Sequence, residues 1–279
     1  MIYVRDKGRM CNNILQYGHL YAWGREHGRK TMSMRFAYKY QYFRICDTPH
    51  HHFATYLFAK YAAKLGLMPV VQFNDINEDT TPQEQVMLTR RHVLAEGWCV
   101  HWFDLFLKYK QEIIRLFEFK DEVKQTVDAL LAQQPESDIL LGVHIRRGDY
   151  RTWQGGRYFY SDEQYLAYIR QFLAMHSGKR VSVYVCGNDP ELDTEKLRLA
   201  LTAPANNGPC ACEVVFPQGN PGEDLCLLSR CDYLMGAPST FTLVASMYRN
   251  TPLCWIMDAN KPLSSDSFDY FDYLFRHII

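Results

Sequence analysis

Residues 139–150, ILLGVHIRRGDY, contain the pattern that decides the fold class of this 279-residue chain. The first seven form a near-continuous apolar run, as expected for a parallel strand whose two faces are covered by helices. Two arginines and a glycine follow where that strand ends. Because ligands of open α/β sheets bind at the carboxyl ends of the strands, this polar tail predicts a binding site.

Strands and helices are expected to alternate through the rest of the second half of the chain. Apolar runs predict further strands at residues 180–186, 213–216, 232–236 and 252–257. Helical periodicity predicts helices at residues 162–176, 192–201, 223–231, 240–249 and 268–277. Such alternation is typical of a doubly wound parallel sheet.

The first half of the chain alternates less regularly. Strands are expected at residues 1–4 and 68–73, with a strand or loop at 98–103. Helices are expected at residues 14–28, 53–65, 83–95 and 108–133. The polar segment 134–138 contains a proline and predicts a linker. We therefore expect an α/β protein with two lobes, residues 1–135 and residues 136–279, each built on a doubly wound parallel sheet.

Composition excludes several classes of protein. Hydrophobic residues make up 47% of the chain, which is too many for a disordered protein. Lysine and arginine balance aspartate and glutamate at 31 each, so no net charge attracts nucleic acid. The sequence lacks both a run of about 18 apolar residues and a signal peptide, so we expect a cytoplasmic protein without a transmembrane segment.

The cysteines and histidines do not predict a metal site. Nine scattered cysteines, an odd number, are typical of reduced thiols in a reducing compartment. Cys210 and Cys212 form a C-x-C without a second pair nearby, and His50–His52 lacks acidic or thiol partners at ligand spacing. We therefore expect no bound metal ion.

Two strand ends carry groups that can bind an anion. The planar guanidinium forks of Arg146 and Arg147 match phosphate, and Gly148 lets the backbone approach closely. Ser239 and Thr240 follow the strand at 232–236 and begin a helix, whose N–H groups bind phosphate well. The alternatives are a structural arginine–aspartate pair at the first end and an ordinary Ser N-cap at the second.

Three further segments fit contacts to a nucleotide. Asn188 and Asp189 follow the strand at 180–186, where they equally fit an Asx turn or a helix cap. Asp224, near the start of a helix, can cap that helix or accept from a nucleobase. The turn at residues 7–13 joins the first strand to a helix and presents backbone N–H groups at the helix start.

These segments together resemble the GDP-fucose-dependent fucosyltransferases, especially the α-1,2-fucosyltransferase family. HIRRGDY (144–150) is similar to the family's H-x-R-R-x-D motif, and VYVCGND (183–189) resembles its strand ending in Ser/Asn-Asp. Residues 227–248, LLSRCDYLMGAPSTFTLVASMY, resemble its second signature, in which Ser-Thr-Phe follows a strand. The turn GRMCNNILQY (8–17) resembles a reduced form of its glycine-rich turn.

The resemblance implies a two-lobed, GT-B-type glycosyltransferase with the acceptor-side lobe first and the nucleotide-sugar lobe second. It implies metal-independent, inverting transfer of L-fucose from GDP-fucose to a glycan hydroxyl, with α-1,2 linkage to galactose, in surface polysaccharide or oligosaccharide synthesis. The alternatives are a transferase that uses another nucleotide sugar and a non-catalytic nucleotide- or glycan-binding module. Peripheral association with a membrane stays open.

The resemblance also implies roles for individual residues. Arg146 would bind the diphosphate and neutralise the leaving group, with His144 and Arg147 in support. The implied donor-binding residues are Arg146, Arg147, Asn188, Asp189, Asp224, Ser239, Thr240, Phe241, Gly8, Arg9 and Asn12. The acceptor hydroxyl needs a general base, which stays open among Asp149, Asp189 and His144.

Overall fold

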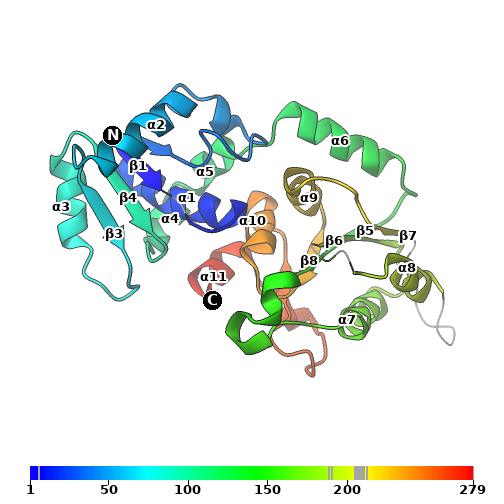
Figure 1. Ribbon diagram of the computed structural model, residues 1–279. Helices are drawn as coiled ribbons and strands as arrows, with labels where there is room; N and C mark the ends of the chain where they lie inside the picture. The colour runs from blue at the N-terminus through cyan, green and yellow to red at the C-terminus, as the bar shows by residue number, and fades with distance from the viewer. Residues whose placement is uncertain (6, 188, 190, 204–210, 212, 279) are drawn as a thin grey trace. The chain divides into compact units, whose positions relative to one another are not determined.

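The computed structural model describes the chain except for residues 6, 188, 190, 204–210, 212 and 279. It divides into two compact units, each with its own parallel sheet (Figure 1): Met1–Lys120 and Asp121–Ile279. The division falls earlier than the boundary expected at residue 135. Helix α6 (Asp121–Ala132) belongs to the second unit because it buries Val123 and Val127 there and its Asp128 pairs with Arg230.

The first unit contains a four-stranded parallel sheet in the order β2-β1-β4-β3. Its strands are β1 (Ile2–Arg5), β2 (Thr31–Ser33), β3 (Val70–Phe73) and β4 (Val93–Gly97). Its helices are α1 (Met10–Glu26), η1 (Arg44–Asp47), α2 (Phe53–Lys64), α3 (Thr81–Thr89), α4 (Phe103–Lys108) and α5 (Lys110–Leu116). The strand order reverses between β1 and β4, so the carboxyl ends of these two strands form a switch point.

Two helix predictions that begin in this unit are wrong in part, and two strands were not predicted. The helix expected at residues 83–95 ends at Thr89, and β4 follows it as a central strand that was not predicted, as β2 was not. All residues of β4 are buried, and so short a buried run lacks the alternation that distinguishes a strand from a helix. The helix expected at 108–133 breaks into α5 and α6, where Phe119 forms an antiparallel bridge with Phe43.

The second unit follows the predicted alternation closely, with a parallel sheet in the order β7-β6-β5-β8-β9. Its strands are β5 (Ile139–Ile145), β6 (Val181–Gly187), β7 (Glu213–Val215), β8 (Tyr233–Gly236) and β9 (Leu253–Trp255). Its helices, besides α6, are η2 (Gly148–Arg151), η3 (Trp153–Gly156), α7 (Asp162–Met175), α8 (Thr194–Thr202), α9 (Pro221–Leu228), α10 (Thr240–Arg249), η5 (Ser265–Ser267) and α11 (Phe271–Arg276). The chain runs outward from β5 to β7 and then returns to β8, so the switch point lies between β5 and β8.

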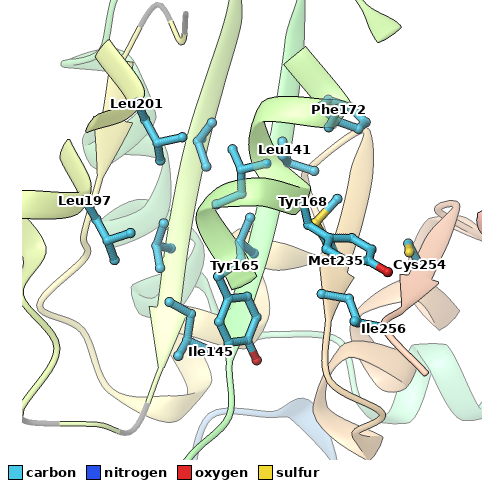
Figure 2. Packing of buried hydrophobic residues seen from close by; sticks show 14 of the residues in the cluster. Leu141, Ile145, Tyr165, Tyr168, Phe172, Leu197, Leu201, Met235, Cys254 and Ile256 are labelled. Atoms are coloured by element: carbon cyan, nitrogen blue, oxygen red, sulfur yellow. The ribbon is translucent and has the colours of Figure 1, made fainter. Parts of the chain in front are cut away.

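Helices cover both faces of this sheet. On one face α7 packs through Tyr165, Tyr168 and Phe172 against Leu141 and Ile145 of β5 (Figure 2). Each such buried side chain stabilises the fold by about 1.5–3 kcal/mol relative to exposure. The other face approaches α9 so closely that a Cβ on Gly142 would lie 2.7 Å from Leu228, which explains the glycine in mid-strand.

Candidate active site

Side chains at the carboxyl end of β5 alternate between the two faces of the sheet. Ile145 packs into the core beneath α7, whereas His144 stacks on Phe241 of α10 with ring centroids 4.8 Å apart. The two arginines separate in the same way. Arg147 reaches Asp162 at the start of α7, and Arg146 stays beside the loops of the switch point.

Arg147 is engaged by internal groups at all three guanidinium nitrogens. Its Nη1 donates to Asp189 Oδ2 at 2.8 Å, its Nη2 donates to Asp162, and its Nε donates to the Tyr160 carbonyl at 3.2 Å. Only 12% of the Arg147 side chain is exposed. This is the structural arginine–aspartate pair considered for this motif, but its carboxylates come from residues far along the chain rather than from Asp149.

Asp189 takes part in this structural network. Burial acts to raise its pKa, but hydrogen bonds from Arg147 and from the Glu191 N–H hold that pKa below its usual value. Its carboxylate therefore stays ionised and faces inward. Its sequence neighbour Asn188, the other candidate at the end of β6, lies outside the described residues.

Arg146 has a buried N–H donor that lacks an acceptor among the described residues of the protein. Its Nη2 donates to Asp149 Oδ2 at 2.8 Å, and its guanidinium carbon lies 5.2 Å from the ring centroid of Tyr150. Its Nε is buried and has no hydrogen-bond partner. Because a buried guanidinium N–H without an acceptor costs free energy, this orphaned donor marks a place where a ligand oxygen would fit.

Tyr150 joins the two loops of the switch point. Its ring lies under Arg146, and its hydroxyl donates to the carbonyl of Pro238 in the turn between β8 and α10. In that turn Ser239 caps α10, since its Oγ accepts from the Phe241 N–H at 3.1 Å. Thr240 is the first residue of the helix. Tyr150 therefore links Arg146 to the turn that precedes α10.

Tyr165 lies beneath the same two loops, and sequence reasoning missed it. Its hydroxyl accepts from the Arg146 N–H at 3.4 Å and from the Ala237 N–H, one from each strand end. Burial raises the pKa of Tyr165 to about 12, so the phenol stays neutral. In sequence it is one more apolar position of a helix, and only the fold places its hydroxyl under the loops.

His144 is buried and neutral. Burial lowers its pKa to about 3, with a further contribution from the positive charge of Arg146. A histidine with so low a pKa is a weak general base at neutral pH. Its flat contact with Phe241 instead ties the end of β5 to the first turn of α10.

Asp224 also has a buried polar atom that lacks a hydrogen-bond partner. It lies in the first turn of α9, but the cap of that helix is Asn220, whose side chain accepts from the Gly222 and Glu223 N–H groups. One carboxylate oxygen of Asp224 is buried without a hydrogen-bond partner. Burial raises its pKa to about 6, and the charge of Glu223 adds to that shift. The helix-cap alternative is therefore wrong.

The first unit has its own turn at the end of β1. Gly8 adopts φ +86°, and a Cβ there would lie 2.5 Å from the side chain of Asn12, so this position requires glycine. Arg9 is the N-cap of α1, which begins at Met10, four residues before the expected start. Gln16 clamps the turn, exchanging hydrogen bonds of 3.1 and 3.0 Å with the backbone of Lys7.

The His50–His52 segment has a structural role at its central residue. His51 is buried, accepts from the Ser33 N–H at 2.9 Å through Nε2, and contacts Thr48 Oγ1 at 2.6 Å through Nδ1. Within the described parts of the chain, no group of three or more His, Cys, Asp or Glu side chains is arranged to hold a metal ion. In those same parts, no helix is long and apolar enough to cross a membrane.

At the switch point of the parallel α/β unit lie a helix N-terminus and Arg146, whose buried Nε lacks a hydrogen-bond partner. This combination suits the binding of a nucleotide diphosphate. Residues 72–268 match the sequence profile of glycosyl transferase family 11, and the chain belongs to that family. The protein is a fucosyltransferase. Family membership thus favours the enzyme over the non-catalytic binding module.

The chain is also similar to individual proteins, among which the solved structures show the fold alone. The mouse (Mus musculus) galactoside 2-alpha-L-fucosyltransferase Sec1 is 26% identical, over 95% of this chain and 68% of its own length. A mutant Arabidopsis thaliana FUT1 in complex with GDP has a similar fold, with TM-score 0.65 and 13% identity over 96% of this chain and 73% of that one. NodZ α-1,6-fucosyltransferase soaked with GDP-fucose gives TM-score 0.53 and 15% identity over 91% and 94%.

Proposed function

We propose that this fucosyltransferase transfers L-fucose from GDP-fucose to the 2-hydroxyl of a galactose residue in a surface polysaccharide or oligosaccharide. The observation that carries the proposal is the orphaned Nε of Arg146 beside the N-terminus of α10. The mouse relative, named a galactoside 2-alpha-L-fucosyltransferase, supports the linkage, and neighbours bound to GDP or GDP-fucose support the donor.

In this proposal Arg146 binds the diphosphate and stabilises the negative charge that develops on it as the bond to fucose breaks. Backbone N–H groups in the first turn of α10, which Ser239, Thr240 and Phe241 form, bind it from the other side. These groups supply the positive charge that many transferases take from a metal ion, so the proposal requires none. Gly8, Arg9 and Asn12, in the turn after β1, stay predicted donor-binding residues.

Transfer with inversion is a single displacement in which the acceptor oxygen attacks the sugar carbon as GDP leaves. The candidate bases differ in what the structure leaves them able to do. His144 has too low a pKa, and only 12% of the Asp189 side chain, which bonds to Arg147, is exposed. Asp149 keeps half of its side chain exposed while it orients Arg146, so we assign the proton-accepting role to Asp149.

The proposal is tested by incubating the purified chain with GDP-fucose and a β-galactoside and identifying the product linkage. GDP is expected to raise the melting temperature more than UDP at equal concentration, because only the bound nucleotide stabilises the folded state. Greater stabilisation by UDP would instead support a transferase that uses another nucleotide sugar. Release of GDP without any fucosylated product would contradict the proposed acceptor.

Asp224 is proposed to recognise guanine, whose N1–H and 2-amino groups donate to a carboxylate. Asp224→Asn is expected to weaken GDP binding about 10–100-fold, because it replaces one acceptor oxygen with a donor. Isothermal titration calorimetry at neutral pH measures this loss. Asp266→Asn, which changes an exposed carboxylate, serves as the control and should bind GDP like the wild type.

The same substitution is expected to raise stability. Because the folded-state pKa of Asp224 lies above its ordinary value of 3.8, ionising it costs stability as pH rises from there to about 6. Asp224→Asn removes that cost, so without nucleotide it should melt at a higher temperature than the wild type at neutral pH. The difference should vanish below about pH 4. A variant that is less stable at neutral pH would contradict the conclusion that the ionised, buried Asp224 carboxylate destabilises the folded state.

A further inference from the structure

Helix α2 of the first unit turns an apolar face toward solvent. Its inward side consists of small buried residues, Ala59 and Ala62. Its outward side and the turn that follows carry large apolar side chains that are 50–78% exposed: Phe53, Phe58, Tyr61, Leu65 and Leu67. We call these five residues the α2 apolar face. A contiguous group of exposed large apolar side chains is typical of an interaction surface, so we expect a partner to cover it.

The charges around the α2 apolar face identify that partner. Residues 48–74 contain no aspartate or glutamate, and Lys60 and Lys64 are the only lysine or arginine residues among them. Both lysines are exposed at the edge of the face, and the Lys60 Nζ lies within 5.7 Å of the ring centroids of Tyr56 and Tyr61. Aromatic and leucine side chains flanked by lysines suit the boundary between acyl chains and anionic headgroups.

Two other observations fit this partner. The buried His51 fixes the start of α2 by its hydrogen bond to the Ser33 N–H, so the face is presented from a rigid base. Tyr38, which is 40% exposed, packs on Tyr56 at 4.6 Å and widens the apolar surface. A symmetric pair of chains joined through this face would, by contrast, bring Lys60 and Lys64 of both copies to one interface without an acidic residue of the segment to pair with them.

We propose that the α2 apolar face docks this enzyme on the surface of an anionic lipid bilayer. Tyr61 and Leu65 enter the acyl boundary, and Lys60 and Lys64 contact the headgroup phosphates. This attachment is peripheral and reversible, because the helix is too short to span a bilayer. It is independent of the proposed donor and acceptor, so it can fail while the proposed function stands.

The experiment measures co-sedimentation of the full chain with vesicles of phosphatidylcholine alone or mixed with phosphatidylglycerol. The wild type is expected to bind the mixed vesicles, and Tyr61→Ser with Leu65→Ser should lower the partition coefficient at least about tenfold. Lys60→Glu with Lys64→Glu should remove the preference for phosphatidylglycerol. The matched control, Leu199→Ser with Tyr273→Ser, changes side chains of 65% and 55% exposure in the second unit and should bind like the wild type.

Each variant is also checked for folding by its melting temperature and by its GDP-induced shift, which exposed substitutions should leave unchanged. Equal partition of the wild type and the Tyr61/Leu65 variant would overturn the proposal, as would failure of the wild type to bind mixed vesicles. A wild-type dimer in light scattering that Tyr61→Ser and Leu65→Ser convert to a monomer, without vesicle binding, would instead assign the face to a second copy of the chain.

Discussion

Arg146→Ala is expected to lower kcat about 10²–10³-fold, because it removes the charge that stabilises the departing diphosphate in the transition state. The structure gives a reason to expect little loss of stability. Arg146 bonds to one half-exposed carboxylate, while its Nε is buried without a partner. The measurement is initial rate at saturating donor and acceptor, together with the melting temperature of the free enzyme.

Arg146→Lys separates charge from geometry. Lysine keeps the positive charge but lacks the planar fork, so it should restore only part of the lost rate. Substrate binding should suffer less than turnover in both variants, since the charge on the leaving oxygen is greatest in the transition state. An alanine variant with wild-type kcat would refute the role of Arg146 and with it the proposed site.

Arg147→Ala is expected to destabilise the fold by about 3 kcal/mol, although it changes the adjacent residue of the same motif. It leaves Asp162 and Asp189, whose side chains are 20% and 12% exposed, without their shared cation. Breaking a buried ion pair by removing one partner costs more than the pair contributes, because a charge stays buried alone. Denaturant unfolding at neutral pH measures the loss.

The structural role of Arg147 also predicts the stability of a triple variant. Arg147→Met combined with Asp162→Asn and Asp189→Asn removes all three charges, so it should recover most of the stability that Arg147→Ala loses. A phosphate ligand would behave differently. If Arg147→Ala unfolded like the wild type and lost GDP affinity instead, Arg147 would belong with Arg146 in the donor site.

The sequence could predict that arginines and a helix start meet at one sheet edge, but it could not distinguish the two arginines. Both residues are arginines and they are adjacent in the chain, so neither composition nor spacing assigns them different roles. Strand alternation sends Arg147 to α7, where Asp162 and Asp189 arrive from segments 15 and 42 residues away. Which carboxylate meets which arginine is therefore a property of the fold.

Two tyrosines show the same limit. Tyr150 is the last residue of the HIRRGDY motif, and Tyr165 lies in the helix expected at residues 162–176. In the structure the Tyr150 hydroxyl reaches Pro238, and the Tyr165 hydroxyl accepts from the backbone of both loops. A hydroxyl at the end of an apolar ring finds its partner only when distant strands are already paired, so no local pattern reveals these bonds.

The amino-acid sequence by itself determined the alternation of the second unit and the motif that places a cation at the end of β5. Both depend on local periodicity and residue type, which act over a few neighbours in the chain. Tertiary structure alone decided that β4 is a central strand and that the Asp224 carboxylate is buried and has a raised pKa. Burial sets these outcomes, and the burial of a residue depends on segments far from it in sequence.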